Sequence, residues 1–344
     1  MDPHSIQLPR EILVGNGVID EISELCNRLG FRGKGLIIAD DVTRKIAGDR
    51  IRENLSGKYF TSLSLISESS FEEAERILKI NHDFNFVIGV GGGRVIDMGK
   101  LVATKHGVPF ISVPTAPSHD GIASERVTIH TETEKASVRA DAPAAIAADI
   151  AILQKTPYRL IASGCADAIS NYTAVYDWNL GRRRGEYYSE YAASLSLLAA
   201  EIVMRSADMI SKGMERGIRN LVEALITSGI AMSMVDSSRP ASGAEHMFSH
   251  SLDYMDSPGL HGEQCGLGSI VTAYLQGQDW TRIHQSLKTI GAPVTIDQLG
   301  IDQETFVGAF LEAKNVRKER HTILNEIDLS RDKIVEAGRV TGVI

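Results

Sequence analysis

The first half of the chain alternates short apolar runs with segments in which apolar residues recur at helical spacing. The apolar runs have the length of β-strands and lie at residues 35–40, 59–66, 86–90 and 109–113. Residues 43–54 and 70–80 have helical spacing, and Ser70 stands where it can cap the second segment. Strands that alternate with helices are typical of βαβ units. We therefore predict a Rossmann-like α/β domain built on a buried parallel sheet.

The pattern changes twice further along the chain. Residues 126–140 alternate apolar and polar positions on either side of 131–134, which predicts a β-hairpin. Beyond about residue 157 the spacing is helical, in the segments 158–180, 186–206, 214–234, 243–254, 262–276 and 280–290. We expect an α/β domain over residues 1–155 and an all-α domain over 156–344. Ligands often bind where two domains meet, so the cleft between them is the expected active site.

Composition excludes some classes of function. The 344 residues are 43% hydrophobic, which is enough for two cores, and 36 basic against 44 acidic side chains give a net charge of −8. Nucleic-acid-binding proteins usually have a basic face, so no nucleic acid is expected as a partner. No apolar stretch approaches the roughly 18 residues of a membrane-spanning helix, and no secretion signal is visible. The three widely spaced cysteines, Cys26, Cys165 and Cys265, fit a reduced, cytoplasmic protein.

A glycine-rich segment follows the strand predicted at 86–90. Gly91, Gly92 and Gly93 stand between that strand and the start of a helix. Glycines let the backbone approach a phosphate, whose charge suits the exposed N–H groups of a helix N-terminus. Arg94 replaces the third glycine of the usual dinucleotide fingerprint, and no Gly-Lys-Ser/Thr sequence ends the segment, which excludes a Walker A loop. We favour a phosphate-binding loop over the alternative, a tight strand-to-helix turn.

Asp40 ends the strand predicted at 35–40 and allows two interpretations. A carboxylate in this position of a dinucleotide-binding fold can accept hydrogen bonds from ribose hydroxyls. It can equally cap the helix that begins near Thr43. A carboxylate beside the ribose would disfavour a 2′-phosphate, so the choice bears on NADH against NADPH.

The segment 112–122 follows the strand predicted at 109–113 and reads Ser-Val-Pro-Thr-Ala-Pro-Ser-His-Asp-Gly-Ile. Two prolines fix its backbone, and polar side chains follow within a few residues. Loops at the carboxyl ends of strands bind ligands in open α/β sheets. The alternative is a rigid turn in which Asp120 bonds its own backbone.

The helical half carries a group of potential metal ligands. Asp167 lies among small and apolar residues, His246 and His250 share one helix face, and His261 follows closely. A carboxylate with imidazoles is a common ligand set for a divalent metal. Glu245 precedes His246, and we expect its side chain to face elsewhere. The alternative is a set of unrelated histidines with their own hydrogen-bond partners, and the spacing leaves both interpretations open.

Taken in order, these motifs resemble the polyol-type dehydrogenases of the iron-containing alcohol dehydrogenase and dehydroquinate synthase superfamily. Within it, the chain is most similar to the archaeal-type sn-glycerol-1-phosphate dehydrogenases. The segment Val-Pro-Thr-Ala-Pro-Ser-His-Asp-Gly-Ile-Ala-Ser at 113–124 is the most specific feature. The resemblance extends over nearly the whole chain.

The resemblance implies a role for each matching residue. Asp167, His246 and His261 would bind one Zn²⁺, and His250 would lie beside the substrate, as would Asp167. Asp120 would contact the substrate, so Asp120, Asp167 and His250 are the expected catalytic residues. The dinucleotide would be held by Ser124 and by two loop segments, which comprise Gly93, Arg94, Val95, Ile96, Asp97, Thr115, Ala116, Pro117 and Ser118.

The implied reaction is the reduction of dihydroxyacetone phosphate to sn-glycerol 1-phosphate by NADH or NADPH, with Zn²⁺ as Lewis acid, for archaeal phospholipid synthesis. The first domain would bind the dinucleotide and the second the metal and substrate, in a homo-oligomer that is not inserted into a membrane. The nearest alternative is a glycerol dehydrogenase acting on the unphosphorylated polyol. A dehydroquinate synthase and a non-catalytic sensor of NAD or metal are further alternatives. His119 and Arg239 are candidates for binding the substrate phosphate.

Overall fold

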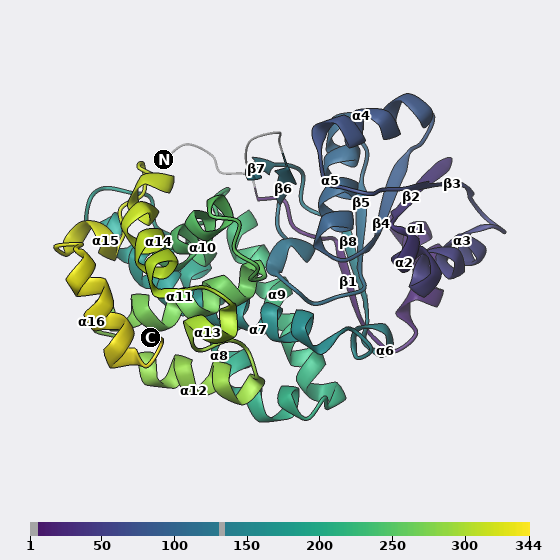
Figure 1. Cartoon of the computed structure of the whole chain (residues 1–344). Helices are drawn as coiled ribbons and strands as arrows, with labels where there is room; N and C mark the ends of the chain where they lie inside the picture. The colour runs from purple at the N-terminus through teal and green to yellow at the C-terminus, as the bar shows by residue number, and fades with distance from the viewer. Residues whose placement is uncertain (1–5, 131–134) are drawn as a thin grey trace. The chain divides into compact units, whose positions relative to one another are not determined.

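The computed structural model describes residues 6–130 and 135–344, which belong to two compact units (Figure 1). The first unit is Met1–Pro157 and the second is Tyr158–Ile344. The expected hairpin tip at 131–134 lies outside the described residues.

The first unit is built on a six-stranded sheet in which every strand pair is parallel, as predicted. The strands, in their order across the sheet, are β1 (Glu11–Gly15), β8 (Ala145–Asp149), β5 (Phe110–Pro114), β4 (Phe86–Gly91), β2 (Lys34–Ala39) and β3 (Phe60–Leu65). The sequence pattern predicted β2, β3, β4 and β5 but not β1 or β8. The sheet places the carboxyl ends of β2, β4 and β5 side by side, and the loops with the expected dinucleotide-binding residues begin there.

Both faces of this sheet are buried. Successive strand residues point in opposite directions, so each strand contributes side chains to two separate cores. Ile37 and Ile88 belong to a core formed with α1 (Ile22–Arg28), α3 (Asp49–Leu55) and the 3₁₀ turn Val18–Glu21. Their neighbours Leu36 and Val87 belong to a second core, formed with α4 (Phe71–Ile80) and α5 (Gly93–His106). Figure 1 shows α4 and α5 on one side of the sheet and α1 and α3 on the other. The predicted α/β layering is therefore confirmed.

Shorter elements complete the first unit. They are α2 (Asp41–Thr43), a π-helical turn (Arg44–Gly48), a 3₁₀ turn (Asp120–Ile122), α6 (Ile150–Leu153) and an antiparallel pair, β6 (Arg126–His130) and β7 (Lys135–Arg139). The β6–β7 pair confirms the predicted hairpin strands. The predicted cap of α4 is also confirmed, because the Ser70 side chain accepts a hydrogen bond from the backbone N–H of Glu73.

The second unit, which is described without gaps, contains helices and no strand. The helices are α7 (Tyr158–Arg182), α8 (Glu190–Ser211), α9 (Glu215–Ser233), a 3₁₀ turn (Arg239–Ala241), α10 (Ala244–Tyr254), α11 (His261–Leu275), α12 (Trp280–Ile290), α13 (Ile296–Leu299), α14 (Gln303–Val316), α15 (Ile323–Glu326) and α16 (Arg331–Thr341). The all-α prediction is confirmed. Helix α8 begins four residues later than predicted, because Ser189 caps it by accepting a hydrogen bond from the Ala192 N–H.

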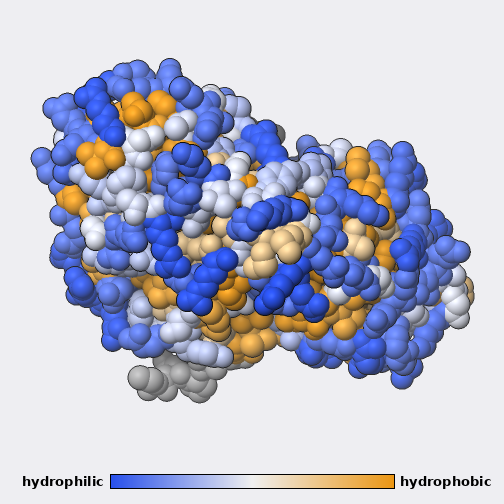
Figure 2. All heavy atoms as spheres, turned by 90° about the horizontal axis from the view of Figure 1, so that it is seen from below, coloured by the Kyte–Doolittle hydropathy of each residue, from blue (hydrophilic) through white to orange (hydrophobic). Residues whose placement is uncertain are grey.

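Large apolar side chains are mostly enclosed in the separate cores of the two units. Hydrophilic residues cover most of the face drawn in Figure 2, with apolar patches among them. Exposed aromatic residues such as Phe60 and Tyr191 occur in both units. Within residues 6–130 and 135–344, no helix combines the length and the hydropathy needed to cross a bilayer.

A buried carboxylate ties four parts of the helical unit together. The Oδ2 atom of Asp177 in α7 accepts a 2.8 Å hydrogen bond from the Ala244 N–H at the start of α10. Its Oδ1 atom accepts bonds from the Gln276 side chain (3.0 Å), which follows α11, and from the Ile323 N–H (2.8 Å), which starts α15. Asp177 has no exposed surface, and this burial, together with the charge of Glu245, raises its pKa to about 7. Asp177 thus fixes the start of the helix that carries His246.

This raised pKa predicts a pH-dependent stability. Unfolded chains release the Asp proton near pH 4, whereas folded Asp177 keeps it to about pH 7. The folded state therefore binds more protons in this interval, and the free energy of unfolding falls as the pH rises from about 4 to 7. We expect a contribution of up to about 1.4 kcal/mol per pH unit, measured by urea denaturation between pH 5 and 8. Asp177→Asn keeps the size of the side chain without its titration and should lack this contribution, so parallel stability curves for the two proteins would contradict the assignment.

Candidate functional site

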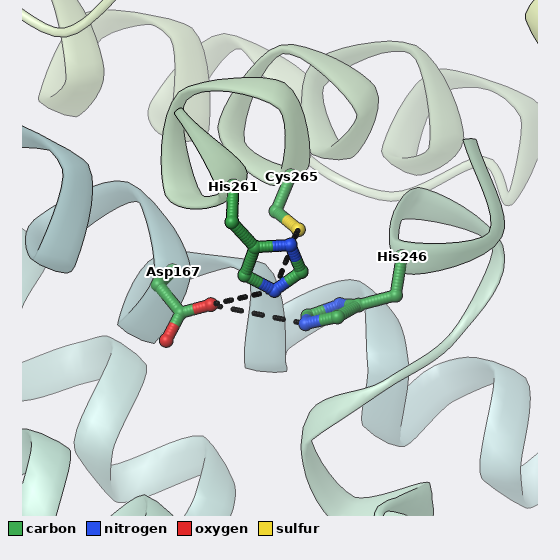
Figure 3. A group of neighbouring side chains, drawn as sticks. All are labelled: Asp167, His246, His261 and Cys265. Atoms are coloured by element: carbon green, nitrogen blue, oxygen red, sulfur yellow. Dashed lines mark hydrogen bonds and ion pairs between the residues drawn. The ribbon is translucent and has the colours of Figure 1, made fainter. Parts of the chain in front are cut away.

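Four potential metal ligands from three helices converge in the second unit. They are Asp167 of α7, His246 of α10, and His261 and Cys265 of α11, and their donor atoms all lie within 4.8 Å of one another (Figure 3). The Oδ1 atom of Asp167 lies 3.8 Å from His246 Nε2 and 3.7 Å from His261 Nε2. Asp167, His246 and Cys265 are buried, whereas His261 is partly exposed. The structure therefore brings together the three expected ligands and adds a thiol that sequence analysis did not place there.

The close approach of α11 to α7 brings His261 to Asp167. A Cβ atom on Gly262 would lie 2.0 Å from the backbone oxygen of Ser163, so only glycine allows this approach. The first turn of α7 adds an ion pair, in which Arg159 Nε lies 2.7 Å from a carboxylate oxygen of Glu263. The same carboxylate accepts a hydrogen bond from the Leu260 N–H and so caps α11. These contacts fix His261 as the first residue of its helix.

Each histidine of the group is oriented through its second ring nitrogen. The carboxylate of Glu245 lies 3.0 Å from His246 Nδ1 and accepts a 2.6 Å hydrogen bond from the Gly243 N–H. The hydroxyl of Ser249 lies 3.1 Å from His261 Nδ1 and donates a hydrogen bond to the Gln264 side chain. Such partners fix which ring nitrogen is free to bind a metal.

The expectation that Glu245 faces elsewhere is wrong. Its side chain turns back to the ring of the adjacent residue, because the Gly243 N–H and the hydroxyl of Thr173 draw the carboxylate to the start of α10. Helical spacing places Glu245 and His246 on different faces and could not show this contact. The carboxylate completely lacks exposed surface, so its position is tightly defined.

The chemistry of the donor set fits a cation such as Zn²⁺. Carboxylate oxygen, imidazole nitrogen and thiolate sulfur are its usual protein ligands, and Nε2 of each histidine faces the shared centre. Burial lowers the pKa of His246, but Cys265 and Glu245 outweigh it and hold the pKa well above its usual value. Burial raises the pKa of the Cys265 thiol to about 11. A cation has to displace these protons, so its affinity increases with pH.

His250 lies near this group but outside it. It is one helical turn after His246, partly exposed, and its ring centroid lies 6.0 Å from that of His261. The spacing of the sequence left both His246 and His250 as possible ligands, and among the described residues only His246 joins the converging donor atoms. The expected role of His250 beside a substrate remains a prediction.

The glycine segment of the first unit forms the end of β4 and the start of α5. A Cβ atom on Gly91 would lie 2.5 Å from the Val95 side chain, and one on Gly93 would lie 1.8 Å from His119 Nε2. Gly92 occupies the N-cap position, and no side chain caps α5 there. Binding of a phosphate at the start of α5 remains a prediction.

Asp40 caps α2, which is one of the two roles that the sequence allowed for it. Its Oδ1 atom accepts hydrogen bonds from the N–H groups of Val42 (3.0 Å) and Thr43 (2.8 Å). Its other oxygen, Oδ2, lies 3.6 Å from the exposed guanidinium of Arg94, which follows the glycines. A contact between Asp40 and a ribose remains a prediction. The structure places Asp40 and Arg94 together at the carboxyl ends of β2 and β4.

The segment 115–124 is held against α5 by a lysine that sequence analysis missed. The Nζ atom of Lys100 donates hydrogen bonds to the backbone oxygens of Gly121 (2.8 Å), Ser124 (3.0 Å) and Arg126 (2.5 Å), and lies 3.2 Å from Asp97. Lys100 has no exposed surface, and burial lowers its pKa despite the carboxylate nearby. Asp97, expected to bind the dinucleotide, also accepts a hydrogen bond from the Thr128 N–H, so its carboxylate is committed within the unit.

Of the remaining expected residues of the first unit, Val95 and Ile96 lie buried in α5, and the others lie in this same segment. Thr115 bonds through its backbone to Gly91 and to the Thr156 hydroxyl, and Asp120 opens the 3₁₀ turn that His119 caps. Arg239, a candidate for the substrate phosphate, lies in the second unit. Only 2% of its surface is exposed, and its guanidinium pairs with Glu186, so its charge is compensated inside that unit.

Comparisons with known proteins give a consistent family. The family described as iron-containing alcohol dehydrogenase matches residues 13–157. The chain is 48% identical to the glycerol-1-phosphate dehydrogenase (NAD(P)+) of Thermococcus kodakarensis over 99% of both chains. It is 46% identical to the enzyme of the same name from Methanothermobacter thermautotrophicus over 100% of both chains.

Solved structures share the fold at lower identity. A probable glycerol dehydrogenase from Sinorhizobium meliloti superimposes with a TM-score of 0.83 at 21% identity, covering 99% of this chain and 100% of that one. A sulfoacetaldehyde reductase from Bifidobacterium kashiwanohense, solved with NAD+, gives a TM-score of 0.77 at 16% identity and covers both chains fully. These similarities establish the fold.

The donor geometry predicts which histidine variants lose metal. After equilibration with Zn²⁺ and dialysis, His246→Ala and His261→Ala should each retain much less zinc than the unchanged protein, measured by elemental analysis. His250→Ala should retain its zinc but lose turnover by about 100-fold, the lower range for loss of a proton-transferring group. Loss of zinc from His250→Ala, with zinc retained by His246→Ala, would reverse the two assignments.

The buried lysine predicts a large effect on stability. Lys100→Met keeps most of the apolar part of the side chain but leaves three carbonyl oxygens and Asp97 without their cation. Breaking a buried ion pair typically costs 3–5 kcal/mol, so we expect a loss of about that size in urea denaturation. Lys105→Met removes an exposed lysine from the same helix and should change stability by only about 0.5 kcal/mol. Equal effects of both substitutions would show that Lys100 does not anchor the segment.

Proposed function

The chain belongs to the glycerol-1-phosphate dehydrogenase family, within the iron-containing alcohol dehydrogenase superfamily, and from this membership we propose that it reduces dihydroxyacetone phosphate to sn-glycerol 1-phosphate with NADH or NADPH. The observation that supports this most directly is the convergence of Asp167, His246 and His261 in the helical unit. A dehydrogenase of this kind needs a group that stabilises negative charge on a ketone oxygen, and this donor set can hold one.

We propose that Asp167, His246 and His261 hold Zn²⁺. When bound, such a cation is a Lewis acid that polarises the ketone as hydride arrives from the dinucleotide. Glu245 and Ser249 keep the histidine rings in the orientation that leaves Nε2 free. The buried carboxylate of Glu245 also increases the basicity of His246. The protein thus provides a preorganised site in which little side-chain movement is needed.

The proton for the new hydroxyl group requires a donor beside the metal site. We propose His250 for this role or for holding the substrate, because it is partly exposed and its ring lies 6.0 Å from the ring of His261. Asp120 is proposed to orient a substrate hydroxyl. Its position at the start of the 3₁₀ turn is fixed through the hydrogen bond from Lys100 to Gly121.

The first unit is proposed to bind the dinucleotide. The uncapped N-terminus of α5 at Gly92 and Gly93 suits its pyrophosphate. The segment 115–118 and Ser124 are proposed to line the same site, because Thr115 bonds to the backbone of Gly91 and Ser124 to Lys100 of α5. Asp40 and Arg94 carry opposite charges at the same edge of the sheet. The acid favours the ribose hydroxyls of NADH, and the base favours the 2′-phosphate of NADPH, which supports the use of both dinucleotides.

The cellular setting is proposed from the cysteines and from the family. Cys26, Cys165 and Cys265 are all unpaired, which is typical of a reducing compartment such as the cytoplasm. By the family resemblance, the chain acts as a homo-oligomer that supplies the glycerol phosphate backbone of archaeal phospholipids.

The proposed function predicts a product of one handedness. The purified protein should oxidise NADH or NADPH when dihydroxyacetone phosphate is added, and a chiral assay should find sn-glycerol 1-phosphate. Removal of metal with EDTA should lower turnover by about 100-fold or more, and Zn²⁺ should restore it, because Lewis-acid stabilisation is worth several kcal/mol. Formation of the 3-phosphate enantiomer, equal turnover of unphosphorylated dihydroxyacetone, or full activity of the chelated protein would contradict the proposal.

A further inference from the structure

We propose that His119 donates a hydrogen bond from its Nε2 atom to the pyrophosphate of the bound dinucleotide. This inference rests on the proposed function, since it assigns a further residue to the dinucleotide site of the first unit. Sequence analysis left His119 as a candidate for the phosphate of the substrate. The contacts of its ring favour the phosphates of the dinucleotide instead.

A backbone contact fixes which nitrogen of the His119 ring carries the proton. The Gly121 N–H donates a 2.8 Å hydrogen bond to Nδ1 of His119. A backbone N–H group can only donate, so Nδ1 is the acceptor and carries no proton. A neutral imidazole has one proton, which therefore lies on Nε2 and makes this atom a donor.

This donor lies against the first residue of helix α5. A Cβ atom on Gly93 would lie 1.8 Å from His119 Nε2, so the ring occupies the space that a side chain at this position would fill. A Cβ atom on Gly121 would lie 2.2 Å from Cε1 of the same ring. Standard bond lengths then place Nε2 at most about 5 Å from the Gly93 nitrogen. The oxygens of one phosphate group can span this interval and accept hydrogen bonds from both nitrogens.

The position of this donor suits an anionic ligand. Among residues 6–130 and 135–344, none accepts a hydrogen bond from Nε2, and the ring is half-buried, so a ligand can reach it. Contact with two glycines holds the ring, so its N–H group points in a fixed direction. Gly92 provides no side-chain cap for α5, so the N–H groups beside Nε2 also lack an acceptor from a capping side chain. The imidazole thus adds a side-chain donor to backbone donors that suit a phosphate.

The surroundings of the ring favour the pyrophosphate over the phosphate of the substrate. His119 packs on the glycine segment between β4 and α5, and dinucleotide-binding folds hold the pyrophosphate at such a segment. The proposed metal ligands, at which the ketone of the substrate would bind, all belong to the second unit. His119 is therefore assigned to the dinucleotide.

Dinucleotide binding by a variant that keeps the turn tests this assignment. His119→Asn retains an oxygen that can accept the Gly121 N–H, but it lacks the part of the ring that carries Nε2. Its dissociation constant for NADH, measured by calorimetry without substrate, should rise about 10- to 100-fold, the range for a lost hydrogen bond to a charged group. ADP-ribose keeps the pyrophosphate without the nicotinamide and should lose affinity by the same factor. His82→Ala removes an exposed histidine elsewhere in the first unit and should bind both ligands like the unchanged protein.

Two further measurements separate this role from a role in folding or in substrate binding. Nitrogen-15 NMR of the unchanged protein should show the His119 proton on Nε2, in a signal that His119→Asn lacks and that shifts when NAD+ is added. The KM of His119→Asn for dihydroxyacetone phosphate, measured at saturating NADH, should equal that of the unchanged protein.

The outcomes distinguish this inference from the proposed function. Unchanged affinity of His119→Asn for NADH, or a proton on Nδ1 in the unchanged protein, would overturn the role of His119 and leave the proposed function intact. A raised KM for dihydroxyacetone phosphate with unchanged NADH affinity would also overturn it, because the ring would then serve the phosphate of the substrate. Failure of the unchanged protein to bind NADH or NADPH would remove the dinucleotide site itself and with it the proposed function.

Discussion

The start of helix α10 is fixed by two buried carboxylates, and the position of the proposed metal ligand His246 depends on them. Asp177 accepts the N–H of Ala244, and Glu245 accepts the N–H of Gly243. A Cβ atom on Gly243 would lie 2.8 Å from an oxygen of Asp177 and 2.9 Å from an oxygen of Glu245, so glycine is needed between them. Buried carboxylates are costly unless hydrogen-bonded, and here the helix end supplies the donors that compensate for lost water. Helix α7 therefore has two roles. It carries the potential ligand Asp167, and through Asp177 it fixes the start of α10, which carries His246.

The first unit uses the opposite charge for a similar purpose. Lys100 places one cation among three carbonyl oxygens and Asp97, and so gathers a proline-containing segment onto α5. In both units, buried ionisable side chains bind backbone groups at a place where regular secondary structure does not pair them. A satisfied polar network of this kind rigidifies its surroundings, since every alternative arrangement leaves a polar group unpaired.

Sequence patterns predicted the elements that bury one continuous apolar face and missed those that do not. Strand β8 reads as an alanine-rich run beside α6, and β1 is a short edge strand with mixed exposure, so neither has a clear period. The expected ligands Asp167, His246 and His261 came from motif resemblance, and the structure brings them together. Glu245, Lys100 and Cys265 could not be placed in advance, because their partners lie on other elements of the fold or depend on how a side chain folds back. Periodicity reports which face of a helix is buried, and it does not report which atoms meet there.

The packing at Gly262 limits how this site could be redesigned. Because the backbone of α7 lies where any larger side chain would begin, α11 cannot be shifted or reshaped locally without moving α7 as well. Attempts to install a different cation preference therefore have to exchange side chains on the existing helix backbones, such as His246 together with its adjacent hydrogen-bond partner Glu245. Gly262 thereby keeps the backbone at His261 in contact with α7 while such side chains are exchanged.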